Sequence, residues 1–323
     1  MAGWQKTYRN LALFTILVCV VFLTACTNDS TSDSTSNNQN LNGNYLPLRL
    51  PVPPENVFVP VRGDIFMEQD NITLDISNAS RGYIMVQYLG YAPRAVARIE
   101  KPDAQYPYDF NLSTNGQWDV FPLTKGSGVH YITILENVHD QMFATALTTS
   151  IDVTIYDSLL PFLYPNQYVN FSRYSQVVAL AAQLALGAHS DIDVIRSVYQ
   201  YIIENIDYDH YLASQITAGM VSTYIPDLDR ILETRLGICF DYAALMVAML
   251  RAQHIPSRLE IGFVTGGLFH AWVSVYTQEY GWVNAVKFSA HGWSLMDPTF
   301  SASGPGLEEF IGDATNYRVM FFH

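Results

Sequence analysis

The sequence predicts a protein of the α+β class, in which an N-terminal antiparallel β-sandwich precedes a unit of helices followed by an antiparallel sheet. Two changes of pattern predict this order. Apolar residues alternate with a period of two between about residues 55 and 155, and they recur at helical spacing after residue 175. Strand-like runs then return after Pro256 without crossover helices between them, which is typical of α+β proteins.

The composition suits a folded chain of about two domains. The chain has 323 residues, of which 49% are hydrophobic and 15% are charged. This is enough apolar material to offset the entropy lost on ordering most of the chain. The formal net charge is −13, so the protein lacks the cationic surface that binds phosphate backbones, and we expect no nucleic-acid partner.

Residues 1–25 resemble the signal peptide of a bacterial lipoprotein. Lys6 and Arg9 form a basic region, and the apolar stretch 11–23 is too short to span a bilayer comfortably. Small residues then precede Cys26. The resemblance implies that Cys26 is the lipid attachment site, so that the protein is anchored in the cell membrane at its extracytoplasmic face. An ordinary secretory signal with an incidental cysteine is the alternative.

The rest of the chain divides into a tether and two domains. Residues 26–54 begin with a stretch rich in Ser, Thr, Asn and Asp, which predicts a flexible, lipid-anchored tether. We place the β-sandwich domain at 55–156 and the second domain at 157–323. The sandwich shows no catalytic motif, so we expect it to be a spacer or a recognition module.

The sandwich domain contains seven short strand candidates, separated by clusters of Gly, Pro, Asn and Asp. Seven strands at this spacing are typical of an immunoglobulin-like sandwich. The candidates are 71–77, 83–88, 95–99, 108–112, 118–123, 129–135 and 146–155.

The second domain begins with two helix signals. Apolar residues from Val177 to Ala185 lie at helical spacing, and Ser190 with Asp193 forms a capping box for a second helix. The C-terminal segment is expected to add a helix and a final strand over 317–322. Four strand candidates that would form one consecutive sheet follow Pro256, at 258–264, 270–276, 282–288 and 293–296.

Cys239 is the only thiol that remains after loss of the signal peptide and lipidation of Cys26. It directly precedes residues 243–252, a strong helix-forming segment rich in Ala, Leu and Met. The partial positive charge at a helix N-terminus favours a thiolate, which is the nucleophilic form of cysteine. Taken alone, Cys239 fits a buried, inert cysteine equally well.

Two later residues have the chemistry to activate a thiol. His270 lies on an alternating strand and could take the thiol proton and return it to a leaving group. Asp297 ends the last strand candidate, just before Pro298, and could orient the imidazole. Either residue alone is more often structural. His291, six residues before Asp297, is the rival base.

Short pieces of sequence around these three residues occur in a fixed order. The pieces are Gly237-Ile238-Cys239, Asp241-Tyr242-Ala243, Leu250-Arg251-Ala252, Ile255-Pro256-Ser257-Arg258, Gly262-Phe263, His270-Ala271-Trp272, Gly281-Trp282 and Asp297-Pro298-Thr299. Together they resemble the transglutaminase-like superfamily of papain-type folds over about residues 191–300. The resemblance implies a papain-like core with Cys239 as nucleophile, His270 as general base and acid, and Asp297 as orienting acid.

The expected reaction is acyl transfer through a thioester. If water attacks the thioester the protein is a cysteine peptidase or amidase, and if a primary amine attacks it is a transglutaminase; we lean to hydrolysis. We expect the substrate to be an extracytoplasmic protein or a cell-wall peptide. Trp272 could line an acyl-binding groove or simply pack, and for Trp282 we favour packing.

No cofactor or metal is expected, because the sequence lacks zinc-protease, calcium-loop and nucleotide-binding motifs. Two other functions remain open. The domain could be a non-catalytic transglutaminase-like binding module of the cell surface, or Cys239 could be purely structural.

Overall fold

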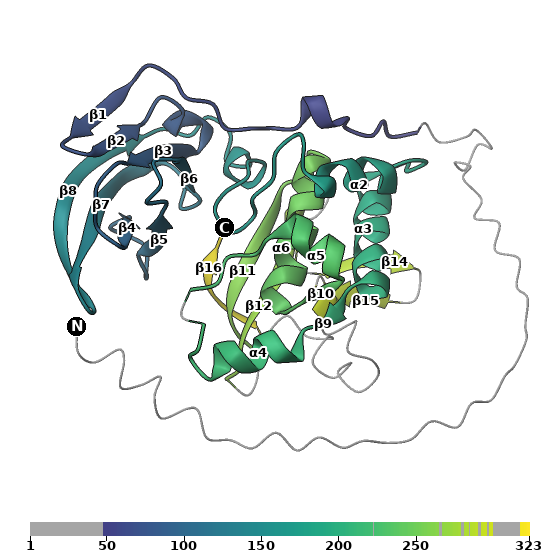
Figure 1. The fold of residues 1–323 in the computed structure, drawn as a ribbon. Helices are drawn as coiled ribbons and strands as arrows, with labels where there is room; N and C mark the ends of the chain where they lie inside the picture. The colour runs from purple at the N-terminus through teal and green to yellow at the C-terminus, as the bar shows by residue number, and fades with distance from the viewer. Residues whose placement is uncertain are drawn as a thin grey trace, which may run out of the picture.

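The computed structural model describes residues 48–221, 223–264, 267–278, 281–283, 285–289, 292–295, 297–299 and 317–323. These residues form a mixed α+β fold with several antiparallel sheets, and the two units lie side by side (Figure 1). The predicted signal peptide, Cys26 and His291 lie outside the described residues. Within the described part, no helix is both long and apolar enough to cross a membrane.

The first unit consists of two antiparallel four-stranded sheets, in the orders β1-β2-β3-β6 and β5-β4-β7-β8. All seven predicted strands are present. Strand β1 was not predicted, because its short sequence is largely exposed and shows no apolar alternation. The strands are β1 (Phe66–Gln69), β2 (Ile72–Asp75), β3 (Tyr83–Tyr88), β4 (Ala95–Glu100), β5 (Tyr108–Leu112), β6 (Trp118–Pro122), β7 (Gly128–His139) and β8 (Met142–Val153), with short 3₁₀ turns η1 (Pro54–Asn56) and η2 (Ala79–Arg81).

The two sheets of the first unit share one hydrophobic core. Ile84 and Val86 on β3 belong to the same buried cluster as Phe110 on β5 and Ile132 and Ile134 on β7. The alternation of apolar residues along each strand places these side chains on one face. The immunoglobulin-like type of this unit stays a prediction.

The second unit combines helices with the antiparallel sheet β13-β12-β11-β16. A 3₁₀ turn η3 (Leu160–Phe162) lies in the segment that enters it. Its elements are α2 (Gln176–Leu184), α3 (Asp191–Asn205), β9 (Asp207–Tyr208), α4 (His210–Thr217), α5 (Leu228–Thr234), β10 (Leu236–Gly237), α6 (Cys239–Ala252), β11 (Ser257–Val264), β12 (Phe269–Thr277), β13 (Gly281–Val283), β14 (Ala285–Ser289), β15 (Gly292–Leu295) and β16 (Tyr317–Phe322).

Both helix predictions are confirmed, including the capping box of α3. The Ser190 hydroxyl accepts a hydrogen bond from the Asp193 backbone N–H at 3.2 Å, and the Asp193 carboxylate accepts one from the Ser190 N–H at 3.0 Å. The prediction of one consecutive sheet after Pro256 is wrong. Among the described residues, β14 and β15 pair only with each other, and the C-terminal β16 joins β11 instead.

Helix α6 is the centre of the second unit. Every residue from Asp241 to Ala252 is buried. The helix contacts β11 and β12 as well as α2, α3 and α5, and it lies between the sheet and the other helices (Figure 1). A helix surrounded in this way must be apolar on all sides, which explains its run of Ala, Leu and Met.

The final residues of the predicted tether are packed rather than free. Arg49 forms an ion pair with Asp191 on α3 at 2.6 Å. The Val52 backbone N–H donates to Gln253 Oε1 at 2.9 Å, and the Val52 carbonyl accepts from Gln253 Nε2 at 3.1 Å. The chain therefore crosses the second unit before it enters the sandwich at β1 (Figure 1).

A buried arginine near the C-terminal end of α6 links the helix to three other segments of the chain. The Arg251 side chain donates to the carbonyl oxygens of Tyr164 at 2.8 Å, Ser257 at 2.8 Å and His323 at 2.7 Å. Burial lowers the pKa of Arg251. Burial, together with the charge of Arg251, also lowers the pKa of His323 to about 3, so its ring is neutral at physiological pH.

Strand β16 pairs with β11 in the sheet of the second unit and also forms hydrogen bonds with residues of the first unit. The Tyr108 hydroxyl donates to the Phe322 carbonyl at 3.0 Å and accepts from the Phe322 N–H at 3.2 Å. Thr124 Oγ1 donates to the same carbonyl at 3.1 Å. The His323 ring lies 5.1 Å from the Tyr108 ring and 4.8 Å from the Tyr168 ring, so the C-terminus is held between the sandwich and the second unit.

We expect the Arg251→Met variant to lower the free energy of unfolding by about 3 kcal/mol, because three buried carbonyls lose a donor worth about 1 kcal/mol each. Chemical denaturation of both proteins measures the difference. The matched control is Arg98→Met, which removes an exposed pair with Asp109 at 2.7 Å. That change should cost about 1 kcal/mol or less, and equal costs for the two variants would contradict the role of Arg251.

Candidate active site

Cys239 is the first residue of α6, as the sequence predicted. Its side chain is half-buried and is a free thiol. The turn before it is tight, because a Cβ atom on Gly237 would lie only 2.8 Å from Asp241 Cβ. Parallel pairing of β10 with β9 fixes the same turn from the other side, with Gly237 opposite Tyr208. The thiol is thus held at the positive end of a rigid helix.

The buried Asp241 side chain locks this turn. Its Oδ2 accepts a hydrogen bond from the Ile238 N–H at 2.8 Å, and its Oδ1 accepts one from the Tyr224 hydroxyl at 2.8 Å. Burial raises the pKa of Asp241 to about 6, and these two donors limit the rise. Tyr208 lies beside the thiol: burial and then the charge of Cys239 raise its pKa to about 12.

His270 lies on β12, opposite Gly262 of β11, and its side chain is buried. His270 Nε2 is hydrogen-bonded to Asp297 Oδ2 at 2.7 Å. Since Nε2 is occupied, Nδ1 is the nitrogen left for the thiol. Burial opposes a charge on His270, but hydrogen bonds with Asp297 and Cys239 outweigh it and raise its pKa to about 10.

The three residues singled out in the sequence therefore lie together, although β11 separates Cys239 from His270 in the chain and β13, β14 and β15 separate His270 from Asp297. Asp297 is fully buried, and the low dielectric around it strengthens its hydrogen bond with His270. A protonated imidazole between a thiol and a carboxylate can stabilise a thiolate and can return a proton to a leaving group.

Trp272 does not line an open groove. Its side chain is fully buried and stacks against His270, with ring centroids 6.3 Å apart and planes 17° apart. Of the two alternatives offered for Trp272, groove lining or packing, this burial favours packing. Trp282 packs as favoured, with its ring centroid 3.7 Å from the Arg258 guanidinium and 4.8 Å from the Phe162 ring.

Sequence reasoning missed Tyr317, the first residue of β16. Its hydroxyl donates to Asp297 Oδ2 at 3.0 Å, the same oxygen that binds His270. It also missed the contact of Tyr224 with Asp241. Neither tyrosine belongs to a motif, so only the pairing of β16 with β11 could have drawn attention to Tyr317.

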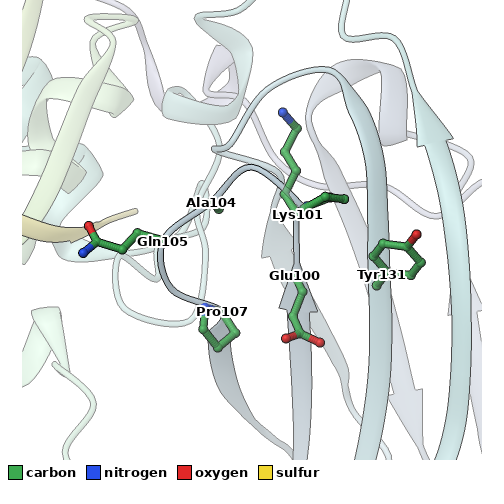
Figure 2. Close-up of a pocket in the computed structure, with 7 residues that line it drawn as sticks. Glu100, Lys101, Ala104, Gln105, Pro107 and Tyr131 are labelled. Atoms are coloured by element: carbon green, nitrogen blue, oxygen red, sulfur yellow. The ribbon is translucent and has the colours of Figure 1, made fainter.

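A surface cavity lies elsewhere, on the sandwich (Figure 2). It contains none of the residues of the thiol site. Among the described residues, no group of His, Cys, Asp and Glu side chains is arranged to hold a metal ion. The cavity is lined by Glu100, Lys101, Pro102, Ala104, Gln105, Pro107 and Tyr131.

The segment that holds the thiol site is similar to a described family. The sequence model of the transglutaminase-like superfamily matches residues 178–298. A protein-glutamine gamma-glutamyltransferase of Pseudomonas aeruginosa is 29% identical over 99 residues, which are 27% of this chain and 13% of that protein. The uncharacterized protein YebA of Bacillus subtilis is 26% identical over 148 residues, which are 36% of this chain and 19% of YebA.

The matched region is thus a small part of both curated relatives. Among solved structures, red sea bream transglutaminase is similar with a TM-score of 0.30 and 12% identity, over 67% of this chain and 48% of that one. The segment that the family model matches, residues 178–298, contains Cys239, His270 and Asp297. The part of the second unit over residues 178–298 is therefore similar to the transglutaminase-like superfamily.

Proposed function

We propose that this protein is a cysteine-dependent acyl-transfer enzyme that forms a thioester on Cys239. The observation that carries the proposal is the pairing of His270 with both Asp297 and Cys239 at the N-terminus of α6. A binding module has no need for this arrangement. The match to the transglutaminase-like superfamily supports the same chemistry.

In the first step, the thiolate of Cys239 attacks the carbonyl carbon of an amide and forms a C–S bond. The Cys239 backbone N–H, at the end of the helix, is a donor for the oxyanion. His270 transfers its proton to the nitrogen of the leaving amine as the C–N bond breaks. Asp297 holds the imidazole in position and stabilises its charged form.

In the second step, His270 removes a proton from the acceptor as the acceptor attacks the thioester. The C–S bond then breaks and the thiolate is restored. We propose water as the acceptor, which makes the protein a peptidase or amidase acting on extracytoplasmic protein or cell-wall peptide. A primary amine is the second candidate, favoured by the name of the Pseudomonas relative, which transfers glutamyl groups from protein glutamine.

We also propose that the chain is a lipoprotein anchored through Cys26 at the extracytoplasmic face of the membrane, which rests on the sequence of residues 1–26. The sandwich is proposed to be of the immunoglobulin-like type. Its strand order supports this, because β4 pairs with β7 and β3 pairs with β6 across long connections. Such crossed connections are typical of Greek-key sandwiches.

Cys239→Ala should abolish turnover of a glutamine-containing peptide, with a loss of about a thousandfold or more, because the covalent step cannot occur. Mass spectrometry of the peptide, with and without a primary amine, separates cleavage, ammonia release and amine incorporation. Arg98→Met, far from the thiol, serves as a control. Residual activity in Cys239→Ala, or a wild-type thiol that iodoacetamide alkylates only above pH 8, would favour the binding-module function.

The alkaline limit of activity should depend on Asp297. The pKa of His270 is raised to about 10, so the proton needed by the leaving amine is present at neutral pH and is lost as the pH rises through 10. Asp297→Asn removes the carboxylate, which should move this limit to lower pH by about 1–3 units. A pH–rate profile measures the shift; Asp109→Asn, in the sandwich, should leave the limit in place, and an unmoved limit in Asp297→Asn would contradict the pairing.

The proposed lipid attachment at Cys26 can be tested by labelling. Cells that express the wild-type chain should incorporate labelled palmitate into it and retain it in the membrane fraction. Cys26→Ser should lose both the label and the membrane association, because no acyl chain is attached. Membrane retention of the unlabelled Cys26→Ser protein would argue for a different attachment.

A further inference from the structure

Strand β16 brings a tyrosine to the buried side of the thiol site. Tyr317, its first residue, lies opposite Val264 at the end of β11. The Tyr317 hydroxyl donates to Asp297 Oδ2 at 3.0 Å, and the same oxygen is 2.7 Å from His270 Nε2. Two donors therefore converge on one oxygen atom, and this fixes the carboxylate from two directions.

The ring of Tyr317 makes a second contact with the same group of residues. It meets the Trp272 ring edge to face, with centroids 4.8 Å apart and planes 68° apart. Trp272 in turn stacks on the His270 ring. His270, Asp297, Tyr317 and Trp272 thus form a closed circuit of contacts, in which Tyr317 contacts the carboxylate directly and the imidazole through Trp272.

The Tyr317 hydroxyl can act only as a donor in this circuit. Burial and the neighbouring Asp297 charge raise the pKa of Tyr317, so the phenol keeps its proton. A hydrogen bond to an ionised carboxylate favours the charged form of the acid. The strand that carries Tyr317 is itself fixed, because its other end is bonded to Tyr108 and Arg251.

The geometry points to Tyr317 as a positioning residue for the His270–Asp297 pair, supplied by the C-terminal strand rather than by the segment that holds the other three residues. The inference rests on the proposed function of Cys239. Tyr317 does not touch the reacting atoms. It acts through Asp297 by holding the carboxylate in line with His270, and therefore the imidazole in line with the thiol.

The test is the Tyr317→Phe variant, which removes the hydroxyl and keeps the ring on Trp272. We expect the rate of alkylation of Cys239 by iodoacetamide at pH 7 to fall about tenfold, because a misaligned imidazolium stabilises the thiolate less well. At high pH, where every thiol is ionised, the two proteins should react equally. An unchanged or faster rate at pH 7 would overturn the inference.

Two further variants separate positioning from a general structural effect. In the Asp297→Ala background, Tyr317→Phe should have no additional effect, since its partner is gone. Tyr108→Phe removes a hydroxyl bonded to the far end of the same strand, and it should leave the alkylation rate unchanged. An equal loss in the Asp297→Ala background, or in Tyr108→Phe, would show that the hydroxyl acts only through the placement of β16.

The wild-type protein distinguishes this inference from the proposed function. If wild-type Cys239 is not alkylated faster at pH 7 than a free cysteine, the proposed function fails. If wild-type Cys239 is alkylated faster than a free cysteine, and the Tyr317→Phe variant is alkylated at the same rate as the wild type, only the role of Tyr317 fails.

Discussion

The burial of α6 from Asp241 to Ala252 is the constraint on which the rest of the second unit depends. Packing on every side leaves the helix no freedom to slide or rotate, because protein interiors are as dense as molecular crystals. Each end of the helix carries a polar side chain that contacts another part of the unit. The N-terminus presents Cys239 toward His270, and the last turn carries Arg251, whose positive charge suits the C-terminal end of the helix dipole.

The charged groups of the site are stable in the interior only because they are hydrogen-bonded to one another. A lone carboxylate as buried as Asp297 would lose several kcal/mol of hydration. Here His270 and Tyr317 both donate to it, and His270 in turn faces the thiol. The low dielectric that makes an unpaired charge costly also strengthens each of these bonds. The pKa of His270 is raised for this reason, in spite of its burial.

Local signals in the sequence predicted most elements. Each of Cys239, His270 and Asp297 alone fitted a structural role, and the three were chosen because they occur together in an order that resembles the transglutaminase-like superfamily. Each of these residues lies at an element boundary or on an alternating strand, where the pattern of neighbours is informative. The pairing of β16 with β11 was not predictable, since Val264 and Tyr317 are 53 residues apart in the chain. Its register depends on a bulge at Gly262, where any Cβ atom would meet the Arg318 carbonyl oxygen at 2.0 Å.

The choice between packing and groove lining for Trp272, and the attachment of Arg49 and Val52, could not be decided from the sequence for a related reason. An alternating strand shows which side chains share a face, but it does not show what covers that face. Trp272 shares a face with His270, yet it lies beneath the ring of Tyr317. The polar composition of the predicted tether likewise gives no sign that its last residues contact the second unit, as Val52 does through its hydrogen bond with Gln253.

The route of the N-terminal segment changes how the sandwich is to be understood. Because residues 49 and 52 are fastened to α3 and to the end of α6, the chain meets the second unit first and reaches the sandwich only afterwards. For a protein held at a surface by its N-terminus, the sandwich is then a side branch rather than a stalk. In that case the length of the sandwich does not set how far the thiol stands from the surface.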